Sequence, residues 1–291
     1  MKKVSNIKIF VAHHKPWYIY EDDIYVPIQV WKKNAKVDLW ILWDDTGDNI
    51  SEKNSNYAEL TAQYWVWKNY DLSDVDYVWF CHYRRYMVYN YKYNKLRFRS
   101  NFNSNYSLIE NIISIYTYIS GKKINKSFNK DEIYSYSNSI KSHLKKKEKD
   151  ILFLTKWWIT WLFPKSAYNF WLVDKDLWNI LHRIIIRQDP CYEKTIKNMQ
   201  NVNIMYGCNM WIFKKDVFIE YCNWLFWILF KLEKEIKNKN LEIICLKEPM
   251  TAWTRFMWCL WERLFNLYLC HKKEQWYTIS KKANMIYFKD I

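Results

Sequence analysis

Glycine is what this sequence has least of. The 291 residues include only three glycines, whereas average usage of roughly 7% would give about 20. A folded chain uses glycine wherever φ is positive or two backbones approach closely. Tryptophan, which is ordinarily among the rarest residues, occurs 19 times. The deficit of one residue type and the excess of the other therefore call for a common explanation.

Several tryptophans stand where glycine is expected. Trp31 follows an apolar stretch and precedes a Lys-Lys-Asn run, a place where a helix would end on glycine. Trp43 opens an acidic turn, and Trp79 interrupts an apolar strand pattern. We hypothesise that many of these codons are UGA, read as tryptophan on paper and as glycine in the cell. The alternative is a protein that is truly rich in tryptophan and stacks sugars on its indole rings.

The two interpretations predict different stabilities. An indole in place of a buried glycine overpacks the site, typically at about 1–3 kcal/mol or more. A dozen such replacements would exceed the roughly 5–15 kcal/mol by which a domain is stable. Trp65, Trp67 and Trp224 lie on amphipathic helical patterns, so we expect these three tryptophans to be genuine.

Other patterns are also missing. No run of 18 uncharged apolar residues predicts a membrane span, and residues 1–6 lack the apolar core of a signal peptide. The seven cysteines include no CxxC pair, which favours reduced thiols in a cytoplasmic protein over a disulfide or zinc framework. No RNP, KH, zinc-finger or helix-turn-helix pattern occurs, so no nucleic-acid partner is expected.

The formal net charge is +15, and much of it lies in the lysine runs 141–149 and 231–239. Such runs usually form a solvated basic face. The same charge would suit peripheral contact with anionic lipid at the inner face of the plasma membrane, or a substrate that carries phosphate.

Strand patterns alternate with helical patterns along the chain. We expect strands at 7–12, 38–43, 76–81, 151–154 and about 204–213, and helices at 56–69, roughly 174–200, 216–236 and around 255–269. This alternation predicts an α/β fold with a mostly parallel sheet flanked by helices and a helical C-terminal half. The length suits a single domain over 1–291, with 88–150 as a variable insertion. In such sheets ligands bind at the carboxyl ends of the strands.

Polar clusters follow three of these strands. His13, His14 and Lys15 follow the first and could hold a diphosphate or a uracil ring, or form an ordinary basic loop. A second cluster begins with Asp44 and Asp45. It suits a metal loop with oxygen ligands or a clamp on sugar hydroxyls, although it lacks the spacing of an EF-hand; otherwise it is a capped turn.

A third cluster comprises His82, Arg84 and Arg85, and it follows the apolar strand at 76–81. An arginine pair at the end of a buried strand can bind phosphate through bidentate hydrogen bonds. His82 adds a hydrogen-bond donor or a proton. The cluster is too polar to continue a buried strand, which favours a functional site.

The three clusters and the helix between them resemble the bacterial capsular and exopolysaccharide glycosyltransferases marked by a C/G-HYRRY signature. The resemblance rests on the segments HKPWYIYEDDIYVPIQV, DDTGDNIS, YAELTAQYWVWKN and DYVWFCHYRRYM. It covers about residues 7–88 and 150–270 and does not extend to 88–150. In such relatives we expect glycine where this chain has Trp31, Trp40, Trp79 and Trp258.

The resemblance implies a GT-A-like fold and a hexosyltransferase. Its donor would be a nucleotide-sugar, in particular a UDP-sugar, and its acceptor a saccharide linked to a lipid. The donor-binding residues would be His13, His14, Lys15, Asp44, His82, Arg84 and Arg85. Asn209 and Arg255 would bind the acceptor or have a structural role.

This chain departs from usual GT-A chemistry at one point. The strand that normally ends in a metal-binding Asp-x-Asp ends here in His82-Tyr83-Arg84. We therefore expect arginines to neutralise the leaving diphosphate and expect no cofactor, although Asp44 and Asp45 keep Mn²⁺ or Mg²⁺ possible. The candidate general bases are Asp45, Glu59 and Glu262.

Two other classes of protein remain open. A non-catalytic carbohydrate-binding protein would need genuine tryptophans that line one exposed groove. A basic RNA- or phospholipid-binding protein would bind with strong salt dependence and would not turn over UDP-sugars. Charge alone does not explain paired acidic and HYRR loops at strand ends, so the glycosyltransferase is the favoured interpretation.

Overall fold

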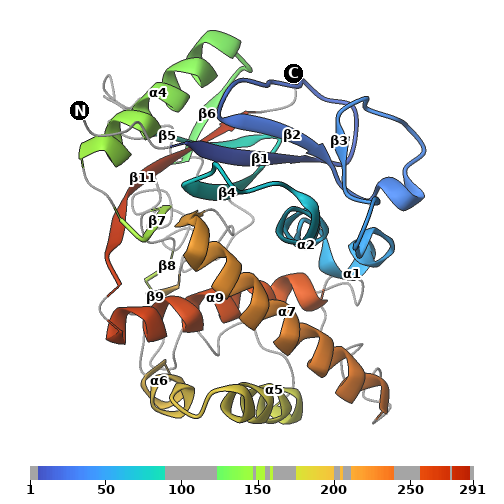
Figure 1. Cartoon of the computed structure of the whole chain (residues 1–291), viewed down its shortest axis with the longest axis vertical. Coiled ribbons are helices and arrows are strands. Elements are labelled where there is room, and N and C mark those ends of the chain that lie inside the picture. The colour runs from blue at the N-terminus through green and yellow to red at the C-terminus, as the bar shows by residue number, and fades with distance from the viewer. Residues whose placement is uncertain are drawn as a thin grey trace, which may run out of the picture.

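The computed structural model describes residues 6–88, 123–146, 149–154, 158–159, 175–199, 204–205, 211–238, 256–275 and 277–288. These residues form a mixed α/β architecture in which helices flank a mostly parallel sheet (Figure 1). The fold class predicted from the strand–helix alternation is thereby confirmed.

Four strands form the parallel half of the sheet, in the order β3-β2-β1-β4. They are β1 (Ile7–His13), β2 (Tyr25–Gln29), β3 (Leu42–Trp43) and β4 (Tyr77–His82). The chain moves outward from β1 through β2 to β3 and then returns to β4 on the other side of β1. The crevice between the carboxyl ends of β1 and β4 is thus a topological switch point, where sheets of this kind bind their ligands.

The sheet continues beyond β4 through β10, β7, β11 and β5, and β6 pairs with β11. These strands are β10 (Trp211–Lys214), β7 (Ile151–Leu154), β11 (Ile279–Phe288), β5 (Arg85–Val88) and β6 (Lys123–Lys126). β10 is antiparallel to both β4 and β7, whereas β11 is parallel to β7. A separate pair joins β8 (Trp158–Ile159) to β9 (Ile204–Met205).

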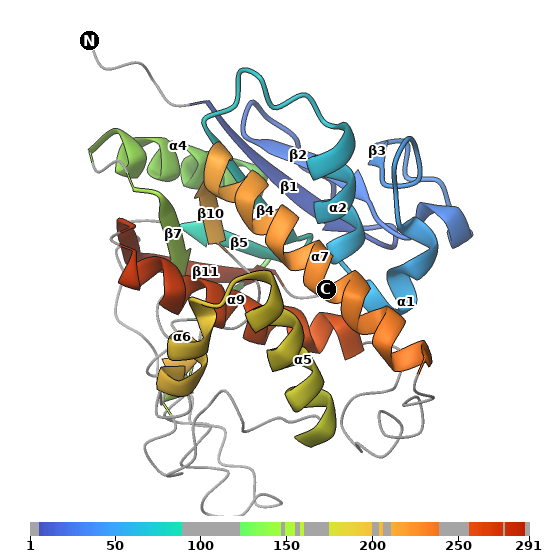
Figure 2. The same cartoon turned by 60° about the horizontal axis from the view of Figure 1, so that its bottom comes forward.

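Helices cover the sheet on both sides. The helices are α1 (Asn54–Tyr57), α2 (Leu60–Asn69), α4 (Lys130–Lys146), α5 (Lys175–Gln188), α6 (Tyr192–Met199), α7 (Lys215–Asn238) and α9 (Phe256–Glu274), with 3-10 turns η1 (Lys32–Asn34) and η2 (Ser51–Lys53). Figures 1 and 2 show α4 on one side and α1, α2, α7 and α9 on the other. α5 and α6 lie beyond α7 and α9, away from the sheet. No helix in the described ranges is both long and apolar enough to cross a membrane.

The core lies between the central strands and the helix layer below them. Ile9, Phe10 and Val11 of β1 are fully buried, and the Phe10 ring stacks on Phe80 of β4 with centroids 5.4 Å apart. Burial of each such side chain stabilises the fold by roughly 1.5–3 kcal/mol. The central strands are therefore held rigidly, and so are the loops at their carboxyl ends.

The predicted helix at 56–69 is wrong in one respect: it is two helices, α1 and α2, separated at Ala58. Ala58 has φ 47° and ψ −130°, a conformation that interrupts any helix. Its carbonyl accepts hydrogen bonds from Asn54 Nδ2 at 2.7 Å and Thr61 Oγ1 at 3.1 Å. Side chains thus replace the helical hydrogen bonds that the break removes.

The predicted strand at 38–43 is also shorter, because β3 covers only Leu42–Trp43. The Gln29 side chain donates to the Val37 carbonyl at 2.7 Å and accepts from the Leu39 N–H at 3.0 Å. This side chain holds the preceding residues as a loop. Strand β2 was not predicted, since Pro27 within it argues against an interior strand.

Two of the tryptophans that were expected to replace glycine occupy glycine-like backbone, whereas Trp43 and Trp79 are strand residues. Trp31 has φ 62° and Trp40 has φ 55°, in the left-handed region that glycine adopts at no steric cost. Trp79 differs, because it is a buried residue of β4 whose Nε1 has no hydrogen-bond partner in the described part of the chain. The side chain of Trp258 lies outside the described structure. The reading of UGA codons as glycine stays a hypothesis, which glycine substitutions at these positions can test.

The tryptophans expected to be genuine lie in ordinary helical positions. Trp65 is buried on α2 and its Nε1 donates to Thr46 O at 3.0 Å and Thr46 Oγ1 at 2.9 Å. Trp67 stacks on Phe226 of α7, and Trp224 is buried on α7. These side chains fill space between helices, although the buried Nε1 of Trp224, like that of Trp79, has no hydrogen-bond partner among the described residues.

Candidate functional site

The polar ends of β1 and β4 lie side by side at the switch point. Ala12 pairs with His82 in the parallel register, and the Tyr83 N–H donates to the Ala12 carbonyl at 3.2 Å. The Tyr83 ring then lies between three imidazoles, with centroids 5.7 Å from His13, 5.3 Å from His14 and 4.1 Å from His82. Strand pairing therefore joins two clusters that are about 70 residues apart in the sequence.

Positive charge gathers around the same tyrosine. Lys15 Nζ lies 5.9 Å from the Tyr83 ring centroid, and Arg84 Cζ lies 5.2 Å from it. Cations over an aromatic face are held by the ring quadrupole. Arg85, the first residue of β5, adds charge next to His82. We call His13, His14, Lys15, His82, Tyr83, Arg84 and Arg85 the switch-point cluster; its charge suits an anionic ligand.

The two buried histidines of this cluster are neutral at pH 7. Burial, with a smaller contribution from His14, lowers the pKa of His13 to about 4. Burial also lowers the pKa of His82 to about 2, and the charges of Arg85, His14, Arg84 and His13 lower it further. The positive charge that an anion would meet therefore comes from Lys15 and the arginines. His13 and His82 act as hydrogen-bonding groups.

A buried neutral His13 makes the stability of the protein depend on pH. The unfolded state binds a proton at the ordinary pKa near 6.5, whereas the folded state binds it only near 4. Lowering the pH from 7 to 5 should therefore cost about 2 kcal/mol of unfolding free energy through this residue. Urea unfolding of the wild type and of His13→Gln at both pH values measures it. An unchanged pH slope in the variant would contradict the burial of a neutral imidazole.

Asp44 organises the turn after β3. It is fully buried and accepts hydrogen bonds from the N–H groups of Trp31 and Lys32, both at 3.1 Å, and from Ser51 Oγ at 2.6 Å. Burial raises its pKa, and these hydrogen bonds oppose the rise. Both carboxylate oxygens are thus engaged inside the loop. The next residue, Asp45, is half-buried. It follows the carboxyl end of β3, at the same edge of the sheet as His13 at the end of β1.

Of the three candidate bases, Glu59 faces the cluster through His82. Its Oε1 lies 3.9 Å from His82 Nε2, and its Oε2 is buried without a hydrogen-bond partner among the described residues. Glu262 is half-buried on α9, whose Met257 N–H donates to Asn56 Oδ1 of α1 at 3.2 Å. Asn209 and Arg255 lie outside the described residues. In the described ranges no three His, Cys, Asp or Glu side chains are grouped as metal ligands.

Tyr83 and Trp17 are site residues that the analysis of the sequence missed. Tyr83 contacts most of the cluster, and Lys15 Nζ lies 6.0 Å from the Trp17 ring centroid. Trp17 Nε1 is buried and has no hydrogen-bond partner in the described ranges. Both residues lie inside the segments that carry the family resemblance, which was the available signal.

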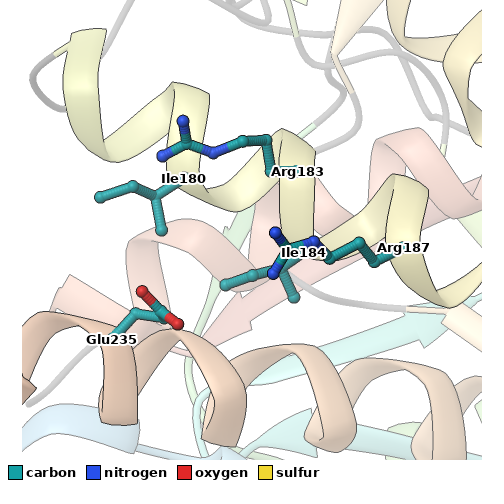
Figure 3. A pocket seen from close by; sticks show the side chains of 5 residues that line it. All are labelled: Ile180, Arg183, Ile184, Arg187 and Glu235. Carbon is teal, nitrogen blue, oxygen red and sulfur yellow. The ribbon is translucent and has the colours of Figure 1, made fainter.

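Two grooves lie away from the cluster. One, of about 450 Å³, is lined by Glu21, Val26, Pro27, Trp40, Ile41, Leu42, Trp43 and Thr46. The other, of about 360 Å³, lies between α5 and α7 and is lined by Ile180, Arg183, Ile184, Arg187 and Glu235 (Figure 3). The first adjoins the acidic turn through Trp43 and Thr46. The second lies in the outer helix layer and shares no residue with the switch-point cluster.

Comparison with known proteins gives two matches. The model of a family described as a domain of unknown function, DUF4422, matches residues 8–273. The apo structure of a bifunctional glycosyltransferase, WbbM, superposes with a TM-score of 0.77 at 27% identity. That match covers 98% of this chain and 46% of the WbbM chain, so the present chain spans a little under half of that protein. No curated protein sequence matches.

Proposed function

The chain belongs to the DUF4422 family, and we propose that it is a glycosyltransferase that moves a sugar from a nucleotide-sugar donor to a saccharide acceptor. The observation that carries this proposal is the cationic cluster at the switch point between β1 and β4, where α/β sheets bind nucleotides. Similarity to a glycosyltransferase structure over nearly the whole chain supports it.

The reaction requires stabilisation of a departing nucleoside diphosphate. Arg84 and Arg85 follow β4 directly, and Lys15 approaches the same tyrosine ring from the β1 side. Preorganised charge of this kind acts where negative charge develops in the transition state. Neutral His13 would complete the site with hydrogen bonds. We propose that these cations take the role of the metal in related folds, with Mn²⁺ or Mg²⁺ at Asp45 as the alternative.

The finer features follow from the resemblance and the charge. We propose a UDP-hexose as donor and a lipid-linked glycan as acceptor, in capsular or exopolysaccharide synthesis. The net charge of +15 supports peripheral contact with the anionic inner face of the plasma membrane. We further propose one domain over 1–291, with 88–150 as an insertion within it. Helix α4 of that insertion contacts the loop after β1, since Ser137 Oγ donates to Asp22 Oδ2 at 2.7 Å.

Binding and turnover of UDP-hexoses test the function. We expect UDP to bind and to compete with a UDP-hexose, and we expect UDP release when octyl hexosides are supplied as acceptors. Calorimetry and a coupled assay for UDP measure the two. Binding of octyl hexosides without any UDP release would instead favour the carbohydrate-binding protein. Salt-dependent binding of RNA or of anionic vesicles without UDP binding would favour a basic RNA- or phospholipid-binding protein.

A further inference from the structure

The chain breaks between helices α1 and α2 at Ala58. A non-glycine residue at φ 47° and ψ −130° is strained, and such strain persists only where surrounding contacts enforce it. Here the Asn54 and Thr61 side chains both bond to the Ala58 carbonyl, and they bond to each other at 3.0 Å. The helical pattern over 56–69 predicts an unbroken helix, so these two side chains hold Ala58 in a conformation that the pattern disfavours.

The break places Glu59 at the head of α2 and directs its carboxylate to the end of β4. The Oε1 atom faces His82 Nε2 at 3.9 Å, and the side chain is 29% exposed. Glu59 is the N-cap residue of α2, and a carboxylate at the N-terminus of a helix interacts favourably with the helix dipole. Arg84 and Arg85, which would face the diphosphate, follow His82 by two and three residues.

His82 makes one hydrogen bond through its ring and turns the other ring nitrogen toward Glu59 across 3.9 Å. Nδ1 accepts from the Arg84 N–H at 3.4 Å, so in the neutral ring the proton belongs on Nε2, which faces Glu59. No ring nitrogen of His82 is then left to accept a proton from a substrate. His82 is a positioning residue that orients the Glu59 carboxylate.

We propose that Glu59 is the general base of the transfer reaction, an assignment that rests on the proposed function. The acceptor hydroxyl loses its proton to the Glu59 carboxylate while its oxygen forms a bond to the anomeric carbon of the donor. The bond from that carbon to the diphosphate oxygen breaks, and its electron pair leaves with the diphosphate, which faces Arg84 and Arg85. Protonated Glu59 then returns its proton to solvent. A single displacement of this kind inverts the anomeric configuration.

Glu59→Gln tests the assignment, because glutamine keeps the shape and cannot take the proton. We expect kcat to fall by about 10²–10⁴, the usual contribution of a general base, with little change in the Kd of UDP. Glu59→Ala should lose kcat as well, and added formate should restore part of it by supplying a carboxylate in place of the missing side chain. Glu52→Gln is the matched control, since Glu52 lies exposed in η2 nearby, and it should keep wild-type kcat. Product NMR should show inversion.

His82 has its own test. His82→Gln keeps a donor near the Nε2 position, so its kcat should exceed that of His82→Ala, while the donor KM stays the same in both. Equal kcat values in the two variants would contradict the positioning role.

The outcomes separate the two proposals. A wild-type protein that releases no UDP from any UDP-hexose overturns the proposed function and this assignment together. A wild type that transfers sugar while Glu59→Gln keeps kcat within about threefold, or a product with retained configuration, overturns the assignment alone. Thermal melting of each variant shows whether it is folded, and Glu59→Asp offers a more conservative change for the same comparison.

Discussion

Replacing Arg84 by alanine should lower kcat by about 10²–10³, the loss typical of removing one preorganised electrostatic donor. Arg84 lies at the carboxyl end of β4 with its guanidinium carbon 5.2 Å from the Tyr83 ring centroid. The departing diphosphate gains charge as the glycosidic bond breaks, so the loss should appear in kcat more than in KM. Steady-state kinetics with a UDP-hexose measure it.

Three comparisons sharpen this result. Arg84→Lys should recover only part of the rate, because lysine lacks the bidentate fork. Arg187→Ala is the control, since Arg187 is exposed on α5 in the outer groove (Figure 3) and should leave kcat unchanged. Transfer should also survive EDTA. If activity is lost in EDTA and recovered with manganese, a metal at Asp44 or Asp45 binds the phosphates in place of the arginines. If Arg84→Ala turns over at the wild-type rate, the HYRR segment has a structural role only.

Glycine at positions 31 and 40 should stabilise the protein, whereas glycine at position 65 should destabilise it strongly. Left-handed backbone costs an L-residue roughly 1–2 kcal/mol, and the extra freedom of unfolded glycine offsets about 0.5–1 kcal/mol of this. Trp31→Gly and Trp40→Gly together should therefore raise the free energy of unfolding by about 1–2 kcal/mol. Trp65→Gly should lower it by about 3–5 kcal/mol, because a buried indole that donates to Thr46 leaves a cavity.

Thermal and urea unfolding of the three variants measure these opposite changes in the free energy of unfolding. Trp40 is the cleanest site, because its side chain is 86% exposed and its removal forfeits little packing. UGA codons at Trp31, Trp40, Trp43 and Trp79 would support the recoding hypothesis independently. If Trp31→Gly and Trp40→Gly destabilise as Trp65→Gly does, the tryptophans are genuine and the hypothesis is wrong.

The sequence by itself determined the fold class and where the polar loops begin. Unbroken apolar runs predicted β1, β4 and β7, and helical periodicity predicted α7, because side-chain period is a local property that survives without tertiary context. The position of Trp31 before a Lys-Lys-Asn run and, for Trp40, the family resemblance marked two sites as glycine-like, and positive φ is a requirement of a single residue that glycine meets.

Only the tertiary structure decided which of these residues meet. Strand order placed His13 beside His82, and the antiparallel entry of β10 next to β4 could not be read from periodicity. The break at Ala58 overrode an amphipathic pattern because Asn54 and Thr61 bond its carbonyl. Burial makes His13 and His82 neutral, since desolvation depends on every segment packed around a ring. Strand pairing and desolvation arise between residues distant in the chain, which is why local pattern alone did not predict the Glu59–His82 contact.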